Sequence, residues 1–209
     1  MSARWDFKAA AAAGIVHILP LHVNRLLRLS RFPATEPYWG KSKAYRFDDP
    51  AEVFGVTYAA LMLDVAFAET ILHRSGQFSD GAWFIDEKNI AARHIVGYQR
   101  PNKPLLALVN LTGSCLKALG LNNDLCSSGD YTDSMLVSAS LHDQLPDVDG
   151  IMYVSRQMNT GRAVALFERS CLRRSSTVMP LKNHPAYGAL LSKFNVAILP
   201  SGRTSTPRH

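Results

Sequence analysis

The sequence predicts a single domain of the α+β class. The chain has 209 residues, and 47% of them are apolar, which is enough for one sizeable core. Short apolar runs typical of strands mix with helical patterns, without the regular strand–helix alternation of a doubly wound sheet. No internal repeat and no linker divides the chain, so we expect one folding unit.

The elements of the first half follow from apolar spacing and from the positions of Pro and Gly. We expect a helix over 5–18 that Pro20 ends, a strand over 23–30, a long loop over 31–50, a strand over 53–59 and a helix over 64–73. The loop precedes a buried strand and carries Arg46 near its end. Such loops often hold functional residues.

The second half is read in the same way. We expect strands over 105–110, 150–155 and 163–167, a short helix over 116–120 that Gly120 stops, and a helix over 132–144. Residues 1–22 are therefore assigned to an N-terminal helical extension and residues 23–199 to the domain itself. Residues 200–209 are rich in Pro, Ser, Thr and Gly, and we expect a flexible tail there.

The charge of the chain favours an anionic small ligand over nucleic acid. Lys and Arg total 23 against 17 Asp and Glu, which gives a formal charge of +6. A basic surface for nucleic acid would usually form a continuous stripe. Residues 118–155 instead hold no Lys or Arg and several aspartates, which fit turns and caps better than a metal site. These are Asp124, Asp130, Asp133, Asp143, Asp147 and Asp149.

The absence of several common motifs argues against disulfide-rich, secreted, membrane-spanning and metal-binding proteins. The three cysteines, Cys115, Cys126 and Cys171, form no C-x-x-C pair, so we expect reduced thiols in a cytoplasmic protein. The apolar run over 9–20 mimics a signal peptide, but no small-x-small cleavage site follows it, and no run reaches the ~18 residues of a membrane span. The sequence contains no G-x-G-x-x-G, Walker A, H-E-x-x-H or G-x-S-x-G motif. No metal site is expected, and His73 fits a helix cap or a surface position.

The most informative segment lies between residues 45 and 70. It reads Y-R-F-D-D-P, then F-G-V-T-Y, then A-F-A-E-T, and so places Arg46, Tyr58 and Glu69 in order along the chain. An apolar strand and an apolar helix carry the last two. Polar groups on apolar elements need partners, and a bound ligand can supply them.

This segment resembles the RES domain, a bacterial family named for its Arg, Glu and Ser. A second block, D-G-I-M-Y-V-S-R over 149–156 with A-L-F over 165–167, is similar to the family's G-I-x-Y-x-S-R segment. The resemblance runs from about residue 28 to residue 167. One departure is that Tyr45 stands where many relatives have a glycine before the second arginine. The resemblance implies a fold similar to ADP-ribosyltransferases, with a mixed, partly split sheet flanked by helices.

The resemblance also implies the roles of individual residues. By position, the catalytic candidates are Glu69, Arg46 and Tyr58, and the substrate-binding candidates are Arg28, Arg46, Tyr58, Ser155 and Arg156. One carboxylate suits cleavage of the nicotinamide–ribose bond of NAD+, because nicotinamide leaves as a neutral molecule and needs no general acid. Arginine forks bind the oxygens of a diphosphate, Tyr58 could stack on the substrate, and Ser155 would donate a hydrogen bond to phosphate or ribose.

Each assignment has a structural alternative. Glu69 could be a surface glutamate in a helical pair, Arg28 an edge-strand residue that covers apolar surface, and Arg46 a partner of Asp48 or Asp49. Tyr58 could be a core tyrosine with a satisfied hydroxyl. Ser155 could be a turn serine, and Arg156 could only stabilise the fold.

The resemblance implies an enzyme that destroys NAD+ by hydrolysis or phosphorolysis. NAD+ is then a substrate, inorganic phosphate is a second substrate of some relatives, and no bound prosthetic group is expected. Many relatives are toxins held inactive by a helix-turn-helix (Xre-type) antitoxin, and we expect such a partner here, with homo-oligomerisation left open. The alternatives are transfer of ADP-ribose to a macromolecule and a non-catalytic domain that binds a partner or nucleic acid.

Overall fold

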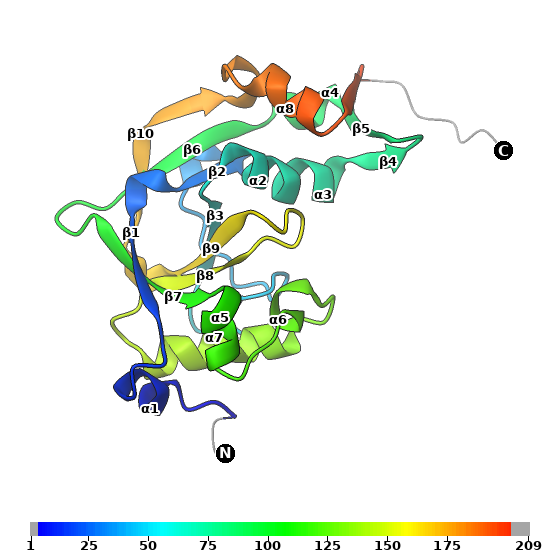
Figure 1. Ribbon diagram of the computed structural model, residues 1–209. Helices are drawn as coiled ribbons and strands as arrows, with labels where there is room; N and C mark the ends of the chain where they lie inside the picture. Colours follow the sequence, from blue (N-terminus) through cyan, green and yellow to red (C-terminus); the bar gives the residue numbers. More distant parts are fainter. Residues whose placement is uncertain (1–3, 202–209) are drawn as a thin grey trace.

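The computed structural model describes residues 4–201, and its centre is a mixed eight-stranded sheet (Figure 1). The strand order is β1-β7-β8-β9-β3-β2-β6-β10, in which only β7 and β8 run parallel. The bounds are β1 Ile18–His22, β2 Leu27–Ser30, β3 Val56–Ala60, β6 His94–Gln99, β7 Leu105–Leu111, β8 Gly150–Val154, β9 Arg162–Phe167 and β10 Arg173–Pro180.

A second sheet of three strands lies apart from the first, in the order β11-β5-β4. Its bounds are β4 Gln77–Ser79, β5 Ala82–Asp86 and β11 Val196–Leu199. The pair β11–β5 is parallel and the pair β4–β5 is antiparallel. The expected α+β class, with a mixed and split sheet flanked by helices, is confirmed.

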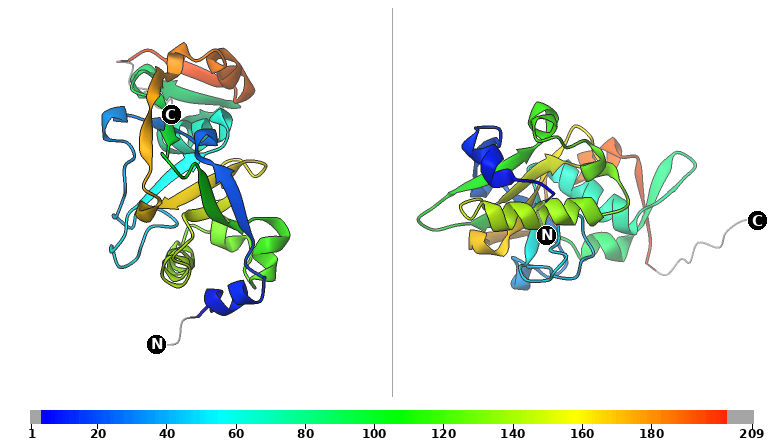
Figure 2. Two further views of the ribbon diagram at one scale, coloured as in Figure 1. Left: turned by 90° about the vertical axis from the view of Figure 1, so that its left-hand side faces the viewer. Right: turned by 90° about the horizontal axis from the view of Figure 1, so that it is seen from below.

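The helices lie on both sides of the main sheet (Figures 1 and 2). Their bounds are α1 Phe7–Ala12, α2 Leu63–Phe67, α3 His73–Ser75, α4 Glu87–Ala91, α5 Gly113–Ala118, α6 Asp124–Ser127, α7 Thr132–Gln144 and α8 Tyr187–Lys193. Helices α5 to α7 form the connection between the parallel strands β7 and β8, since parallel strands cannot be joined by a tight turn. A π-helical turn, Ala68–Leu72, joins α2 to α3.

The central strands are buried on both faces. Alternate residues of β9 enter different clusters: Ala165 packs with the helices of the crossover, and Val164 and Leu166 pack on the opposite face. A third cluster forms between α2, the π turn and the small sheet, with Phe67 and Ile71 fully buried. The central strands therefore form a rigid base for side chains that project at their ends.

The expected helix over 5–18 is wrong in its length. Helix α1 covers only Phe7–Ala12, where the Asp6 carboxylate accepts a hydrogen bond from the N–H of Ala9 at 2.8 Å. Gly14 follows with a φ of +71°, and the chain then forms β1, an edge strand of the main sheet that pairs with β7. Pro20 is tolerated because it lies on this edge strand.

Of the other expected elements, some are confirmed and two strands begin later than expected. The helix over 132–144 and the strands over 105–110, 150–155 and 163–167 are confirmed to within a residue or two at their ends. The strand over 23–30 is shorter than expected, because a 3-10 turn occupies Val23–Arg25. The strand expected over 53–59 begins later, since the Asp49 carboxylate accepts hydrogen bonds from the N–H groups of Val53 and Phe54 and holds a turn there.

Of the tail expected over 200–209, residues 202–209 lie outside the described residues. Within residues 4–201, no helix combines the length and the apolar character that crossing a bilayer requires.

Candidate active site

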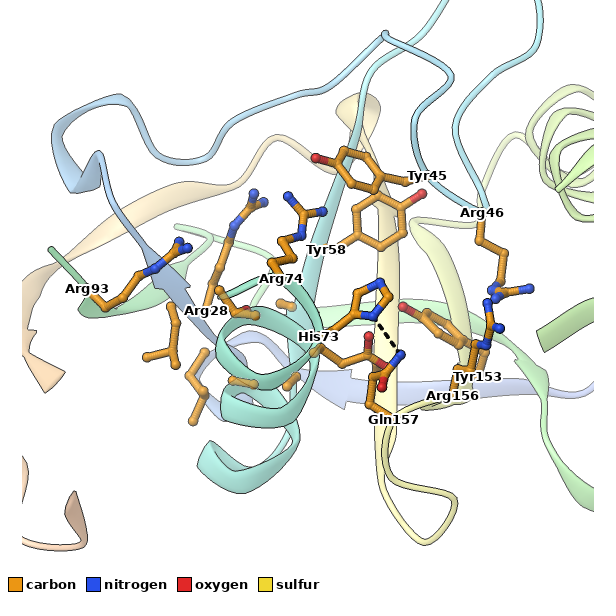
Figure 3. Close-up of a pocket in the computed structure, with 18 of the residues that line it drawn as sticks. Arg28, Tyr45, Arg46, Tyr58, His73, Arg74, Arg93, Tyr153, Arg156 and Gln157 are labelled. Carbon is orange, nitrogen blue, oxygen red and sulfur yellow. Dashed lines mark hydrogen bonds between the residues drawn. The ribbon is translucent and has the colours of Figure 1, made fainter. Parts of the chain in front are cut away.

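A cavity of about 190 Å³ lies between the main sheet, the α2–α3 helix and the loop that leads to β3 (Figure 3). It brings together side chains from segments that lie far apart in the sequence. Among the predicted site residues, Arg28, Arg46, Tyr58, Glu69 and Arg156 line it. Ser155 does not line it but contacts it through Glu69.

Glu69 is half-buried on the π-helical turn and is the one carboxylate among the described residues that line the cavity. Wide π turns inside helices are rare and occur often at functional sites. The Ser155 hydroxyl donates a hydrogen bond to Glu69 Oε1 at 2.6 Å. The partner of Glu69 is thus a residue of the β8–β9 turn, and not a neighbour on the same helix as the alternative of a surface helical pair required.

A third group also holds the Ser155 hydroxyl in place. Ser155 Oγ accepts a hydrogen bond from the N–H of Met158 at 3.1 Å, and its own proton goes to Glu69, because an ionised carboxylate can only accept. The Ser155 side chain is buried, with the residue only 1% exposed. It therefore positions the glutamate, whereas the sequence predicted a donor to phosphate or ribose.

The turn that carries Ser155 packs closely on the helix that carries Glu69. A Cβ atom placed at Gly161 would collide with Cγ2 of Val65 on α2. Gln157 Nε2 and His73 Nδ1 lie 3.0 Å apart and join the same two segments at the edge of the cavity (Figure 3). These contacts fix the position of the β8–β9 turn relative to the α2–α3 helix.

Tyr58 presents its ring to the cavity, but its hydroxyl is already engaged. The hydroxyl donates to Asp48 Oδ1 at 3.0 Å and accepts from the N–H of Phe47 at 2.9 Å. Burial, together with the Asp48 carboxylate, raises the pKa of Tyr58 well above its ordinary value. Burial also raises the pKa of Asp48. Tyr58 can therefore supply a ring face but is poorly suited to proton transfer, and Tyr45 packs against it edge-on at 5.5 Å between ring centroids.

Arg28 lies on β2 and already has an acidic partner. Its Nε atom lies 3.3 Å from Glu36 Oε1, and its Nη1 donates to Thr57 Oγ1 at 2.8 Å. The Glu36 side chain is only 2% exposed and also accepts from the Tyr98 hydroxyl at 3.0 Å. Arg28 thus reaches the cavity with much of its charge balanced inside the protein.

Arg46 is held in a different way. Its Nη1 donates to the backbone carbonyl oxygens of Leu125 and Ser128, at 3.0 and 3.1 Å. Its guanidinium lies over the Tyr131 ring, 4.7 Å from the centroid. The alternative pairing with Asp48 or Asp49 is wrong, since those carboxylates bind Tyr58 and backbone N–H groups. No carboxylate among the described residues forms an ion pair with Arg46.

Sequence reasoning missed two arginines of the cavity, Arg74 and Arg93. In an ordinary α-helix, positions five apart point roughly 140° away from one another. The π turn changes this, because it closes i to i+5 contacts, and Arg74 can face the cavity together with Glu69. Arg93 lies between α4 and β6, in a region for which no element was predicted.

The cavity is strongly cationic. Among the described residues, five arginines line it, Arg28, Arg46, Arg74, Arg93 and Arg156, beside the single carboxylate of Glu69. Burial and the nearby charges of Arg31, Arg74 and Arg28 lower the pKa of Arg93 to about 10. An anionic ligand would relieve this repulsion. In the part of the chain that the structure describes, no group of three His, Cys, Asp or Glu is placed to hold a metal ion.

Comparisons with known proteins bear on the family and the fold of the chain. The family model described as RES domain matches residues 22–184. Among solved structures, a chain of the crystal structure of the M. tuberculosis MbcT–MbcA toxin–antitoxin complex is similar, with a TM-score of 0.57 and 13% sequence identity. The similarity covers 90% of this chain and 96% of that chain, and at this identity it bears on the fold. The comparison with curated proteins gives no match.

Proposed function

Because this chain belongs to the RES domain family, we propose that it cleaves NAD+ at the bond between nicotinamide and ribose. The observation that carries the proposal is Glu69: a lone carboxylate, held by a buried serine, in a cavity lined by five arginines. This set of groups suits a substrate that is anionic at its diphosphate and becomes cationic at its ribose during reaction.

The reaction requires little proton chemistry on the leaving group. The C1′–N bond breaks, its electron pair neutralises the pyridinium nitrogen, and nicotinamide leaves uncharged. An oxygen of water then bonds to C1′ and releases a proton, which gives ADP-ribose. Glu69 would stabilise the positive charge that develops on the ribose, and the Ser155 hydrogen bond would keep its carboxylate in place.

The arginines and tyrosines would bind and orient the dinucleotide. Arg46 and Arg156 offer guanidinium groups with no acidic partner among the described residues, which suits the diphosphate. The Tyr58 ring would pack on the substrate and exclude water from the reacting bond. Inorganic phosphate could replace water as the acceptor, and the product would then be a phosphorylated ADP-ribose.

We also propose that the protein is the toxin of a toxin–antitoxin pair. The supporting observation is the similarity in fold to a chain of a toxin–antitoxin complex over most of both chains. A helix-turn-helix antitoxin would be the partner. Co-expression with a small helix-turn-helix protein encoded next to this chain should relieve growth arrest and give a complex on size-exclusion chromatography.

The substitution Glu69→Gln tests the catalytic role. Glutamine keeps an oxygen to accept the Ser155 hydrogen bond but removes the charge, so the fold should persist. We expect turnover of NAD+ to fall at least ~100-fold, which is the usual worth of a group that stabilises transition-state charge. Purified protein, NAD+ and quantification of nicotinamide provide the measurement.

The matched control is Glu87→Gln. Glu87 pairs with Lys182 at the surface and does not line the cavity, so its removal should leave turnover unchanged. Wild-type turnover in the Glu69→Gln variant would refute the catalytic role. Mass spectrometry of the products separates the alternatives: free ADP-ribose or its phosphorylated form excludes obligatory transfer to a macromolecule.

A further inference from the structure

We propose that the cavity contains a second anion subsite, formed by Arg93 with Arg74 and Arg28, for a phosphate group other than the NAD+ diphosphate. The inference rests on the proposed function only where it assigns the diphosphate to the opposite side of the cavity. The ligand chemistry is a terminal phosphate: inorganic phosphate, or the 2′-phosphate of NADP+.

Arg93 is the centre of this subsite because it is buried without a partner. The residue is 9% exposed and lines the cavity. Its Nε atom is buried and has no hydrogen-bond partner among residues 4–201. A buried donor left unpaired is costly, and a buried cation more so. A phosphate in the cavity would supply both the acceptor and the opposite charge.

The neighbours of Arg93 reinforce its charge. Arg74 is exposed and stacks on the Tyr45 ring at 4.7 Å from the centroid, with no carboxylate partner among the described residues. Arg28 is balanced by Glu36, so the surplus of positive charge on this side comes from Arg93 and Arg74. Two unbalanced guanidiniums match the charge of one phosphate dianion.

The arginines divide into two groups on opposite sides of the cavity. Figure 3 shows Arg93, Arg28 and Arg74 on one side and Arg46 and Arg156 on the other, with His73 and Gln157 between them. The two phosphorus atoms of a diphosphate are neighbours, so one group of arginines is enough to bind it. NAD+ has no further phosphate, and the second group is therefore available to another anion.

The two sources of that phosphate lead to different chemistry. If inorganic phosphate binds there, one of its oxygens bonds to C1′ as the C1′–N bond breaks. The electron pair goes to the ring nitrogen, and no oxidant or reductant is required. If the 2′-phosphate of NADP+ binds there, the subsite selects the phosphorylated dinucleotide and the acceptor remains water.

Binding can be measured without catalysis in a Glu69→Gln background, by isothermal titration with inorganic phosphate, NAD+ and NADP+ at matched ionic strength. The additional substitution Arg93→Met should weaken phosphate or NADP+ binding by at least ~10-fold, in line with loss of a charged hydrogen bond. NAD+ affinity should fall by a clearly smaller factor. Arg46→Gln should show the reverse order, with NAD+ affected more than phosphate.

The matched control is Arg31→Met. Arg31 also lies near enough to lower the pKa of Arg93, but it is exposed, bonded to Asn89 at 2.7 Å and absent from the cavity lining. Equal losses in the Arg31 and Arg93 variants would reduce the effect to general electrostatics and overturn the subsite. Equal loss of NAD+ and phosphate binding in Arg93→Met would also overturn it, as would absence of phosphate and NADP+ binding before the substitution.

Turnover measurements then identify which phosphate the subsite binds. Phosphate-dependent turnover with a phosphorylated ADP-ribose product supports inorganic phosphate, and preference for NADP+ over NAD+ supports the 2′-phosphate. Phosphate binding by a protein that consumes no NAD+ would refute the proposed function and leave the subsite standing.

Discussion

Arg28 and Arg46 were predicted to bind a diphosphate in the same way, yet their guanidinium groups have different partners in the structure. Arg28 faces the buried Glu36 carboxylate at 3.3 Å. Arg46 is fixed by two neutral carbonyl oxygens and an aromatic ring. Carbonyls orient a guanidinium and leave its charge largely unbalanced, whereas a carboxylate neutralises it. We infer that Arg46 is the stronger anion ligand and that Arg28 has a larger structural role.

Substitution of Arg46 provides the largest expected effect. Arg46→Gln removes an unbalanced charge from the cavity, and we expect kcat/KM for NAD+ to fall by about 100-fold, mostly through KM. Steady-state kinetics with the exposed Arg162→Gln as control gives the measurement. A variant that loses stability but keeps its KM would show that the charge serves the fold, and the contrast with Arg28 would disappear.

Substitution of Glu36 tests the other side. Glu36→Gln leaves Arg28 without its counter-charge and replaces an oxygen that accepts from Tyr98 and from the N–H of Tyr38. Because Arg28 is 26% exposed, we expect a loss of about 2 kcal/mol in the free energy of unfolding, below the full cost of a broken buried pair.

The control for this loss is Glu52→Gln, which breaks an exposed pair with Lys43. Exposed pairs contribute little, so its effect on urea denaturation should stay within about 0.5 kcal/mol. If both variants lose the same stability, the Arg28–Glu36 pair is no more structural than a surface pair.

Substitution of Ser155 tests how far its hydrogen bond to Glu69 contributes to catalysis. Glu69 lies in the cavity that both groups of arginines line. Ser155→Ala removes the hydrogen bond to Glu69 without touching the cavity lining. We expect kcat to fall about 10-fold, because a less fixed carboxylate stabilises the reacting ribose less well, with KM little changed. A parallel rise in KM would instead place Ser155 among the groups that bind substrate.

Substitution of Arg93 should have the smallest effect, and it should raise the free energy of unfolding, whereas substitution of Glu36 should lower it. Arg93→Met removes a buried, unpaired charge, and we expect the free energy of unfolding of the free protein to rise by about 1 kcal/mol near neutral pH. The pKa of Arg93 in the folded protein is lowered to about 10. Below that pH the buried charge therefore destabilises the wild type, and the free energy of unfolding of the wild type rises as the pH rises through about 10 and Arg93 loses its proton.

The difference between Arg93→Met and wild type should therefore shrink between pH 7.5 and pH 10.5. Urea denaturation at the two pH values measures it. A destabilised variant at neutral pH would mean that contacts of the arginine stem outweigh its charge, and the case for a poised anion site would weaken.

Patterns of apolar residues predicted much of the fold, and the resemblance to the RES domain supplied the main site residues. The segments 132–144 and 105–110 were correct because local propensity and the flanking turn residues agree there. The small sheet of β4, β5 and β11 was missed, because its strands are short and depend on pairing between distant segments.

The site shows the same limit. Arg46, Tyr58 and Glu69 were found because the segment that carries them resembles the RES domain, and all three line the cavity. Arg74 could not be found from helical spacing, since a π turn breaks the ordinary period. The Ser155–Glu69 bond depends on how a distant turn docks on the helix, which no local pattern records.

The close fit of Gly161 against Val65 has a consequence for sequence variation. The β8–β9 turn is a surface connection of the kind that usually tolerates substitution. Here a single added methyl group would push the turn off α2 and carry Ser155 away from the glutamate. Random mutagenesis followed by selection for clones that no longer arrest growth should therefore recover changes at Gly161, although this residue does not itself line the cavity.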